Sequence, residues 1–109
     1  LDVRDAVESF SLLEEKGKSG EAYNVSGENP CSIEELLSMV LKTCPVEVDV
    51  VVDQSLVREK DEPIYWNDLS KLKRETGFVQ KIPLEKTVED MIKWWVDNLK
   101  ESRGLGQCL

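Results

Sequence analysis

The stretch that decides the fold runs from Ser32 to Val52 and reads SIEELLSMVLKTCPVEVDVVV. Ser32 and Glu35 have the spacing of a capping box, in which each side chain accepts a hydrogen bond from the other residue's backbone amide, so we expect a helix to begin here. Pro45 cannot continue that helix. Beyond it, valines alternate with acidic residues, a pattern typical of a half-buried strand. The stretch therefore predicts a helix followed by a strand.

Upstream, residues 2–25 show the same order of helix and strand. Asp2 is a suitable N-cap, and the apolar residues that follow it have helical spacing. Gly17 and Gly20 end this helix in a turn. Residues 22–25, with the sequence AYNV, then form a short strand. A strand of this length needs neighbouring strands before it is stable.

Downstream, residues 53–63 are polar and irregular, and two further helices follow. Asp68 caps the first, which Gly77 ends. The second runs from about Leu84 to Lys100, with an apolar stripe at intervals of three and four residues. The fold class predicted for the isolated chain is α+β, helix-rich with two or three short strands.

Composition excludes several functions. The 109 residues carry a formal net charge of −8, which does not suit a nucleic-acid or anionic-membrane partner. The sequence has no histidine, so it cannot form a Ser-His-Asp or Cys-His catalytic set. Its three cysteines form no CxxC pair, so we expect no metal site and reduced thiols in a cytoplasmic protein.

One loop, residues 56–63, combines groups that suit a nucleotide. Arg58 has a planar guanidinium that matches phosphate, and Asp61 can accept hydrogen bonds from ribose hydroxyls. A solvated loop of mixed charge accounts for the same composition and is the commoner case.

Several motifs together resemble the C-terminal part of extended short-chain dehydrogenases/reductases, the NAD-dependent epimerase/dehydratase family. The matching runs are VRDAV at 3–7, GEAYNVSG at 20–27, SIEELL at 32–37, REKDEP at 58–63, NDLSKL at 67–72, ETGF at 75–78 and IPLEKT at 82–87. In order and spacing the later runs are most similar to GDP-mannose 4,6-dehydratases and GDP-4-keto-6-deoxymannose reductases. Glu59, Asn67 and Phe78 depart from that pattern, which weakens the subfamily assignment more than the fold.

The resemblance implies a division of the chain. Residues 1–28 would be the last helix and strand of a Rossmann-type domain, residues 29–101 the sugar-nucleotide-binding subdomain, and residues 102–109 a flexible tail. The intact parent would bind NAD(P) through a glycine-rich turn and transfer protons with a Tyr-x-x-x-Lys pair. This chain has neither motif, so we expect it to bind no cofactor, to have no catalytic residue and to be inactive by itself.

The resemblance also implies roles and partners. Arg58 would meet phosphate and Asp61 ribose or base of a GDP-linked sugar, and the intact parent would be a homodimer. Since its first helix and strand have no sheet to join, we expect the chain by itself to expose an apolar surface, to dimerise or to belong to a longer protein. A UDP-sugar epimerase fragment, and a non-enzymatic acidic interaction module anchored by Trp66 or Trp94, remain alternatives.

Overall fold

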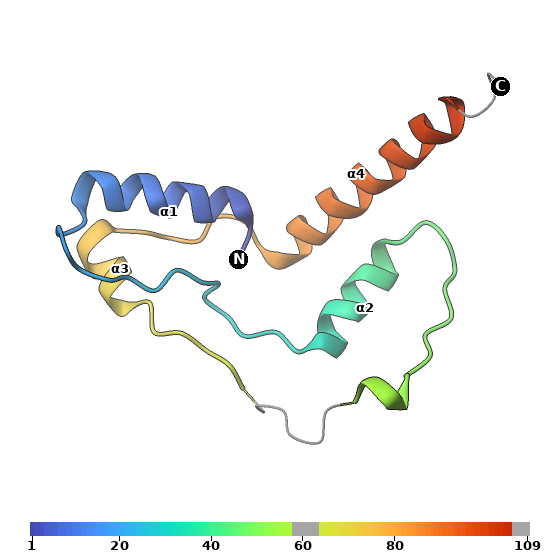
Figure 1. The fold of residues 1–109 in the computed structure, drawn as a ribbon, viewed down its shortest axis with the longest axis horizontal. Helices are drawn as coiled ribbons and strands as arrows, with labels where there is room; N and C mark the ends of the chain where they lie inside the picture. Colours follow the sequence, from blue (N-terminus) through green and yellow to red (C-terminus); the bar gives the residue numbers. More distant parts are fainter. Residues whose placement is uncertain (58–63, 106–109) are drawn as a thin grey trace. The chain divides into compact units, whose positions relative to one another are not determined.

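The computed structural model describes residues 1–57 and 64–105, and these residues form two compact units (Figure 1). The first unit comprises Leu1–Cys31 and Asp49–Ile82, and the second comprises Ser32–Val48 and Pro83–Leu109. The helical elements are α1 (Val3–Lys16), α2 (Ile33–Thr43), the short 3-10 helix η1 (Gln54–Leu56), α3 (Ser70–Thr76) and α4 (Leu84–Leu105). None of the helices in the described residues is long and apolar enough to cross a membrane.

Helix α1 begins and ends as the sequence predicts. The Asp2 carboxylate accepts a hydrogen bond from the Arg4 amide at 2.8 Å, and the Gly17 amide donates to the Leu13 carbonyl at the other end at 2.8 Å. The helix packs against α3, as Figure 1 shows. Its fully buried residues are polar, Asp5 and Ser9, so hydrogen bonds rather than apolar packing fix its inner face.

The core of the first unit is small and lies around α3. Leu69, Leu72 and Phe78 are each at most 6% exposed. Gly77 ends α3 with φ 75°, a left-handed conformation that glycine adopts without the steric cost a side chain would bring. The chain turns there and buries Phe78, whose amide donates to the Thr76 hydroxyl at 3.1 Å.

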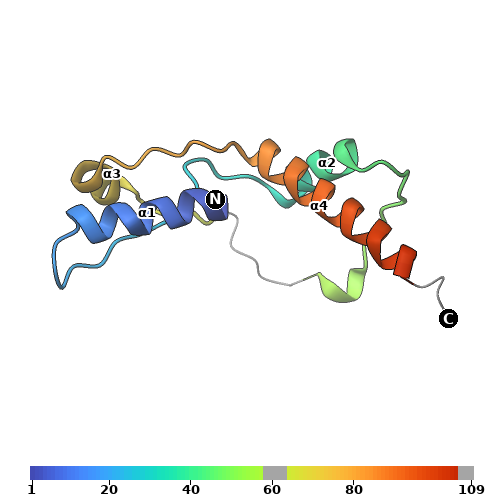
Figure 2. The ribbon, with the colours of Figure 1, turned by 90° about the horizontal axis from the view of Figure 1, so that it is seen from above.

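The second unit is a pair of helices, α2 and α4, which pack against each other (Figure 2). The capping box predicted at the start of α2 is present: the Ser32 amide donates to Glu35 at 2.8 Å and the Glu35 amide donates to Ser32 at 3.1 Å. Among this unit's described apolar side chains, Val88 is fully buried, at 2% exposure. Helix α4 continues to Leu105, past the predicted end near Lys100.

The α+β prediction is not confirmed. Among residues 1–57 and 64–105 no strand forms: residues 22–25 and 46–52 are irregular instead. Both segments have the composition of strands, but a strand is stable only when a second one pairs with its backbone. The described residues are helix-rich, and the predicted exposed apolar surface is confirmed, since Val3, Val7 and Phe10 of α1 are all at least 60% exposed.

Candidate functional site

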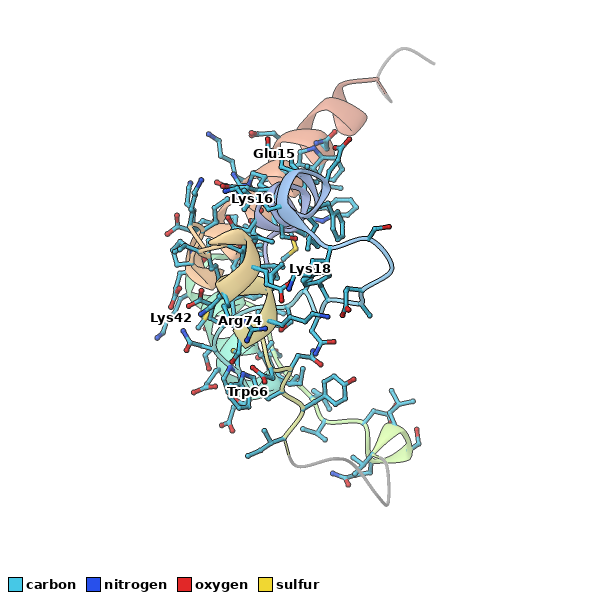
Figure 3. All side chains as sticks on the ribbon, turned by 90° about the vertical axis from the view of Figure 1, so that its left-hand side faces the viewer. Glu15, Lys16, Lys18, Lys42, Trp66 and Arg74 are labelled. Carbon is cyan, nitrogen blue, oxygen red and sulfur yellow. The ribbon has the colours of Figure 1, made fainter. Side chains whose placement is uncertain are left out.

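The two predicted site residues, Arg58 and Asp61, lie outside the described residues. The structure therefore does not test their roles. It does describe the segment that follows them, from Ile64 into α3. Trp66, labelled in Figure 3, lies in this segment. Its side chain is 66% exposed.

A small pocket of about 130 Å³ lies in the first unit, where this segment enters α3. Its lining residues are Glu28, Trp66, Asn67, Asp68, Leu69, Ser70 and Lys73. It therefore combines an aromatic ring with amide, hydroxyl, carboxylate and ammonium groups, and its residues 66–70 follow shortly after the loop that carries Arg58 and Asp61. We take this pocket as the candidate site.

An ion pair forms one wall of the pocket. The Lys73 ammonium lies 3.0 Å from the Glu28 carboxylate. Glu28 and Gln80 also bind each other reciprocally: the Glu28 amide donates to the Gln80 side chain at 3.0 Å, and the Gln80 amide donates to the Glu28 carboxylate at 3.3 Å. Lys73 first, and then the Gln80 amide, lower the pKa of Glu28, so Glu28 stays ionised.

Asp68 stands at the entrance to α3. Its carboxylate accepts a hydrogen bond from the Ser70 amide at 2.8 Å, but the N-cap of α3 is Leu69, which has no side-chain cap, so the predicted N-cap at Asp68 is wrong by one residue. Hydrogen bonds from the Ser70 side chain and then its amide lower the pKa of Asp68. Asn24 donates through its side-chain amide to the Asp68 carbonyl at 3.3 Å.

A second set of polar contacts holds residues 18–23 against α3. The Tyr23 hydroxyl donates to the Glu75 carboxylate, which also pairs with Lys18 at 3.4 Å and Arg74 at 3.3 Å. Figure 3 labels Lys18 and Arg74. The Tyr23 hydrogen bond is the main reason that the pKa of Glu75 falls to about 2, with Arg74 and Lys18 adding to the effect.

Lys71 of α3 extends this set of contacts. Its ammonium contacts the Glu21 carboxylate at 2.6 Å and the Ala22 carbonyl at 2.8 Å, and it lies 4.5 Å from the centre of the Tyr23 ring. These contacts join residues about 50 positions apart in the chain. They fix the segment that carries Glu28 relative to the helix that carries Lys73.

This geometry suits binding better than catalysis. The exposed Trp66 ring offers a face on which a planar base can stack, an interaction typical of nucleotide sites. The charged lining residues are Glu28, Asp68 and Lys73, a net charge of one negative, so the described wall does not attract phosphate by itself. No group of His, Cys, Asp and Glu within the described residues could hold a metal ion.

Sequence reasoning missed Glu28, Lys73 and the Tyr23–Glu75 contact. The charged residues Lys71, Lys73, Arg74 and Glu75 are evident in the sequence, but such a run predicts only a solvated helix face. The opposite partners lie more than 40 residues upstream, and the sequence gives no register for pairing them. Trp66 was considered only as an anchor for a protein partner.

Comparison with known proteins relates the chain to a class of sugar-nucleotide enzymes. No family model and no solved structure matches. Curated proteins do: the chain is 27% identical to the dTDP-glucose 4,6-dehydratase of Shigella flexneri over 92% of its own length and 31% of that protein. The identity and both coverages are the same for dTDP-glucose 4,6-dehydratase 1 of Escherichia coli K12. The dTDP-glucose 4,6-dehydratase of Streptomyces niveus is 26% identical over 90% of the chain and 29% of that protein.

The chain thus has distant similarity to dTDP-glucose 4,6-dehydratases along most of its length. It spans about a third of the length of these relatives. The similarity supports the sugar-nucleotide dehydratase part of the predicted resemblance, and it does not extend to a specificity for GDP-mannose.

Proposed function

We propose that this chain is the sugar-nucleotide-binding part of a nucleotide-sugar dehydratase or reductase whose catalytic residues lie elsewhere in a longer protein. The observation that carries the proposal is the similarity to dTDP-glucose 4,6-dehydratases over 92% of the chain but only 31% of the relative. The whole enzyme would act on the hexose, and this part would supply affinity and orientation. Binding energy remote from the reacting bond helps catalysis in this way.

In this proposal three residues contact the sugar nucleotide. Arg58 pairs with the diphosphate, Asp61 accepts hydrogen bonds from the ribose or the base, and the exposed ring of Trp66 stacks on the base. The only cation among the pocket's lining residues, Lys73, is already paired with Glu28 at 3.0 Å. The proposal therefore assigns the diphosphate to a cation outside the described pocket. We propose Arg58 for this role, because it is the last arginine in the sequence before Trp66 of the pocket.

The proposal keeps the division of the chain near residue 28. Helix α1 buries Asp5 and Ser9 but exposes Val3, Val7 and Phe10 at 60% or more, as expected of a helix whose apolar side belongs against a sheet. NAD(P) would bind to the rest of the enzyme, because this chain offers no glycine-rich turn for the pyrophosphate. We further propose a cytoplasmic, homodimeric parent, with residues 102–109 as its tail.

The identity of the base is a separate question within this proposal. The run at 58–63 resembles GDP-mannose enzymes, whereas the relatives bear the name of dTDP-glucose. We propose guanine, as in a GDP-linked sugar, as the base, and thymine, as in a dTDP-linked sugar, as its competitor. A UDP-sugar, the ligand of the epimerase alternative, completes the comparison.

Calorimetric titration of the 109-residue chain with GDP-mannose, dTDP-glucose and UDP-glucose tests both points. The proposal expects saturable binding of at least one, and the tightest identifies the base. Arg58→Ala should weaken that binding at least tenfold, because a charge-assisted pair contributes about 1.5–3 kcal/mol. Arg74→Ala, which removes an arginine outside the pocket, should leave it unchanged.

Failure of all three sugar nucleotides to bind would reject the proposal and favour a protein-interaction module. Binding that Arg58→Ala does not weaken would keep the ligand class but remove Arg58 from the site. Equal losses with Arg58→Ala and Arg74→Ala would point to general electrostatics rather than to a phosphate contact.

A further inference from the structure

The candidate pocket has the size and charge to take the base of a sugar nucleotide rather than the whole molecule. Its volume is about 130 Å³, whereas pockets that enclose a complete small-molecule ligand measure about 300–1,000 Å³. Its charged lining residues, Glu28, Asp68 and Lys73, sum to one negative charge. A pocket of this charge disfavours a diphosphate and favours a group that presents N–H donors.

Trp66 does not choose among bases by itself. Every base has a π-face that can stack on an indole ring, so stacking tolerates any base. Discrimination has to come from hydrogen bonds to the edge of the base. The polar residues that follow Trp66 directly in the lining are Asn67 and Asp68.

The side-chain amide of Asn67 is available to a ligand. The residue is half-buried and lines the pocket. In the part of the chain that the structure describes, no other group hydrogen-bonds to this amide. A half-buried amide that the protein leaves unpaired gains a hydrogen bond from a ligand that offers one.

Asp68 adds an ionised acceptor beside this amide. Its carboxylate accepts a hydrogen bond from the Ser70 amide at 2.8 Å. Hydrogen bonds from Ser70, first from its side chain, also lower the pKa of Asp68. A carboxylate has about four lone-pair sites, so the contact with Ser70 leaves others for a ligand. The side chain is exposed, so a ligand can reach it.

We infer that Asn67 and Asp68 read the base and select guanine. The pairing edge of guanine presents the O6 acceptor followed by the N1–H and N2–H donors. The Asn67 amide donates to O6, and the Asp68 carboxylate accepts from both N–H groups. Thymine and uracil have a carbonyl oxygen on each side of a single N–H, so one of these oxygens would face the carboxylate and be repelled.

The inference rests on the proposed function, because it names the residues that choose the base of the sugar nucleotide. Calorimetric titration of the 109-residue chain with GDP and IDP tests it. IDP differs from GDP only in lacking the N2 amino group. GDP should bind about tenfold more tightly than IDP, because IDP loses one charge-assisted hydrogen bond to Asp68. dTDP and UDP should also bind more weakly than GDP.

Asp68→Asn should largely abolish the preference for GDP over IDP, since it removes the charged acceptor. Asp53→Asn is the matched control. The Asp53 carboxylate accepts from the Ser55 amide at 2.9 Å, the same contact that Asp68 makes with Ser70, and it lies in the same unit but outside the pocket. It should keep the preference. Circular dichroism checks that both variants keep their helices.

Asn67→Ala separates the two readers. It should weaken the binding of GDP and IDP alike, because both bases carry O6. Equal affinities for GDP and IDP in the unaltered chain, tighter binding of dTDP or UDP, or equal effects of Asp68→Asn and Asp53→Asn would overturn the inference and leave a nucleotide site in place. Binding of none of the four nucleotides would reject the proposed function and the inference with it.

Discussion

The two units of this chain are stabilised in different ways. The first has a small apolar core and many polar contacts between distant segments, among them Asp5 to the amides of residues 81 and 82 at 2.9–3.3 Å and Glu28 to Gln80. The second has a regular helix pair with Val88 as its fully buried apolar residue and long apolar stripes open to solvent. The polar contacts of the first unit thus fix the geometry of its pocket, whereas the second unit leaves apolar side chains of its two helices exposed.

The largest expected effect is the loss of stability when a large aromatic side chain, Phe78 in the first unit or Trp95 in the second, is replaced by alanine. Phe78 is 1% exposed, and Phe78→Ala should lower the free energy of unfolding of the first unit by about 3–5 kcal/mol through the cavity it leaves. Trp95→Ala should cost the second unit about half as much, because the ring is already 53% exposed.

Residue-resolved hydrogen exchange measures both losses, since it reports opening of each unit separately. Equal losses in the two units would show that the second unit has a core of its own.

Next in size is the loss of the buried carboxylate of α1. Asp5 is 1% exposed and accepts hydrogen bonds from the Lys81 and Ile82 amides. Asp5→Ala should cost about 2–4 kcal/mol, because two backbone amides lose an ionised acceptor that is itself buried. Urea unfolding measures the change.

Glu8→Ala is the control for Asp5→Ala. Glu8 also contacts Lys81, but through the exposed ammonium group, so its loss should cost no more than about 1 kcal/mol. If both substitutions cost the same, the buried hydrogen bonds are not what holds α1.

The comparison also separates what the sequence predicts from what it does not. The helix starts at Asp2 and Ser32 were predictable because a cap is a local contact between residues two or three apart. The strand predicted from the valines of 46–52 does not form in the described residues, because it depends on a partner strand. The Tyr23–Glu75 contact joins residues 52 positions apart, which no local pattern specifies. Arg58 and Asp61 stay predictions.

A smaller effect is expected on the pH dependence of the first unit. The pKa of Glu75 is lowered from 4.5 to about 2, so its contribution to stability is present above pH 4.5 and is lost as the pH falls toward 2. Tyr23→Phe removes the main cause of the lowered pKa and should flatten the acid loss of stability in this window. Urea midpoints measured across the window test this.

Tyr65→Phe provides the control, since Tyr65 is 83% exposed and should not change the profile. An unchanged profile in Tyr23→Phe would mean that other carboxylates govern acid unfolding.

The most direct test of the sugar-nucleotide site is a titration followed by NMR through the indole N–H signals of the three tryptophans. Trp66 lines the pocket at the start of α3, whereas Trp94 and Trp95 lie on α4. Saturable binding of a sugar nucleotide should shift the Trp66 signal and leave the other two in place. Movement of the α4 signals alone, or of none of the three at saturating ligand, would contradict the site.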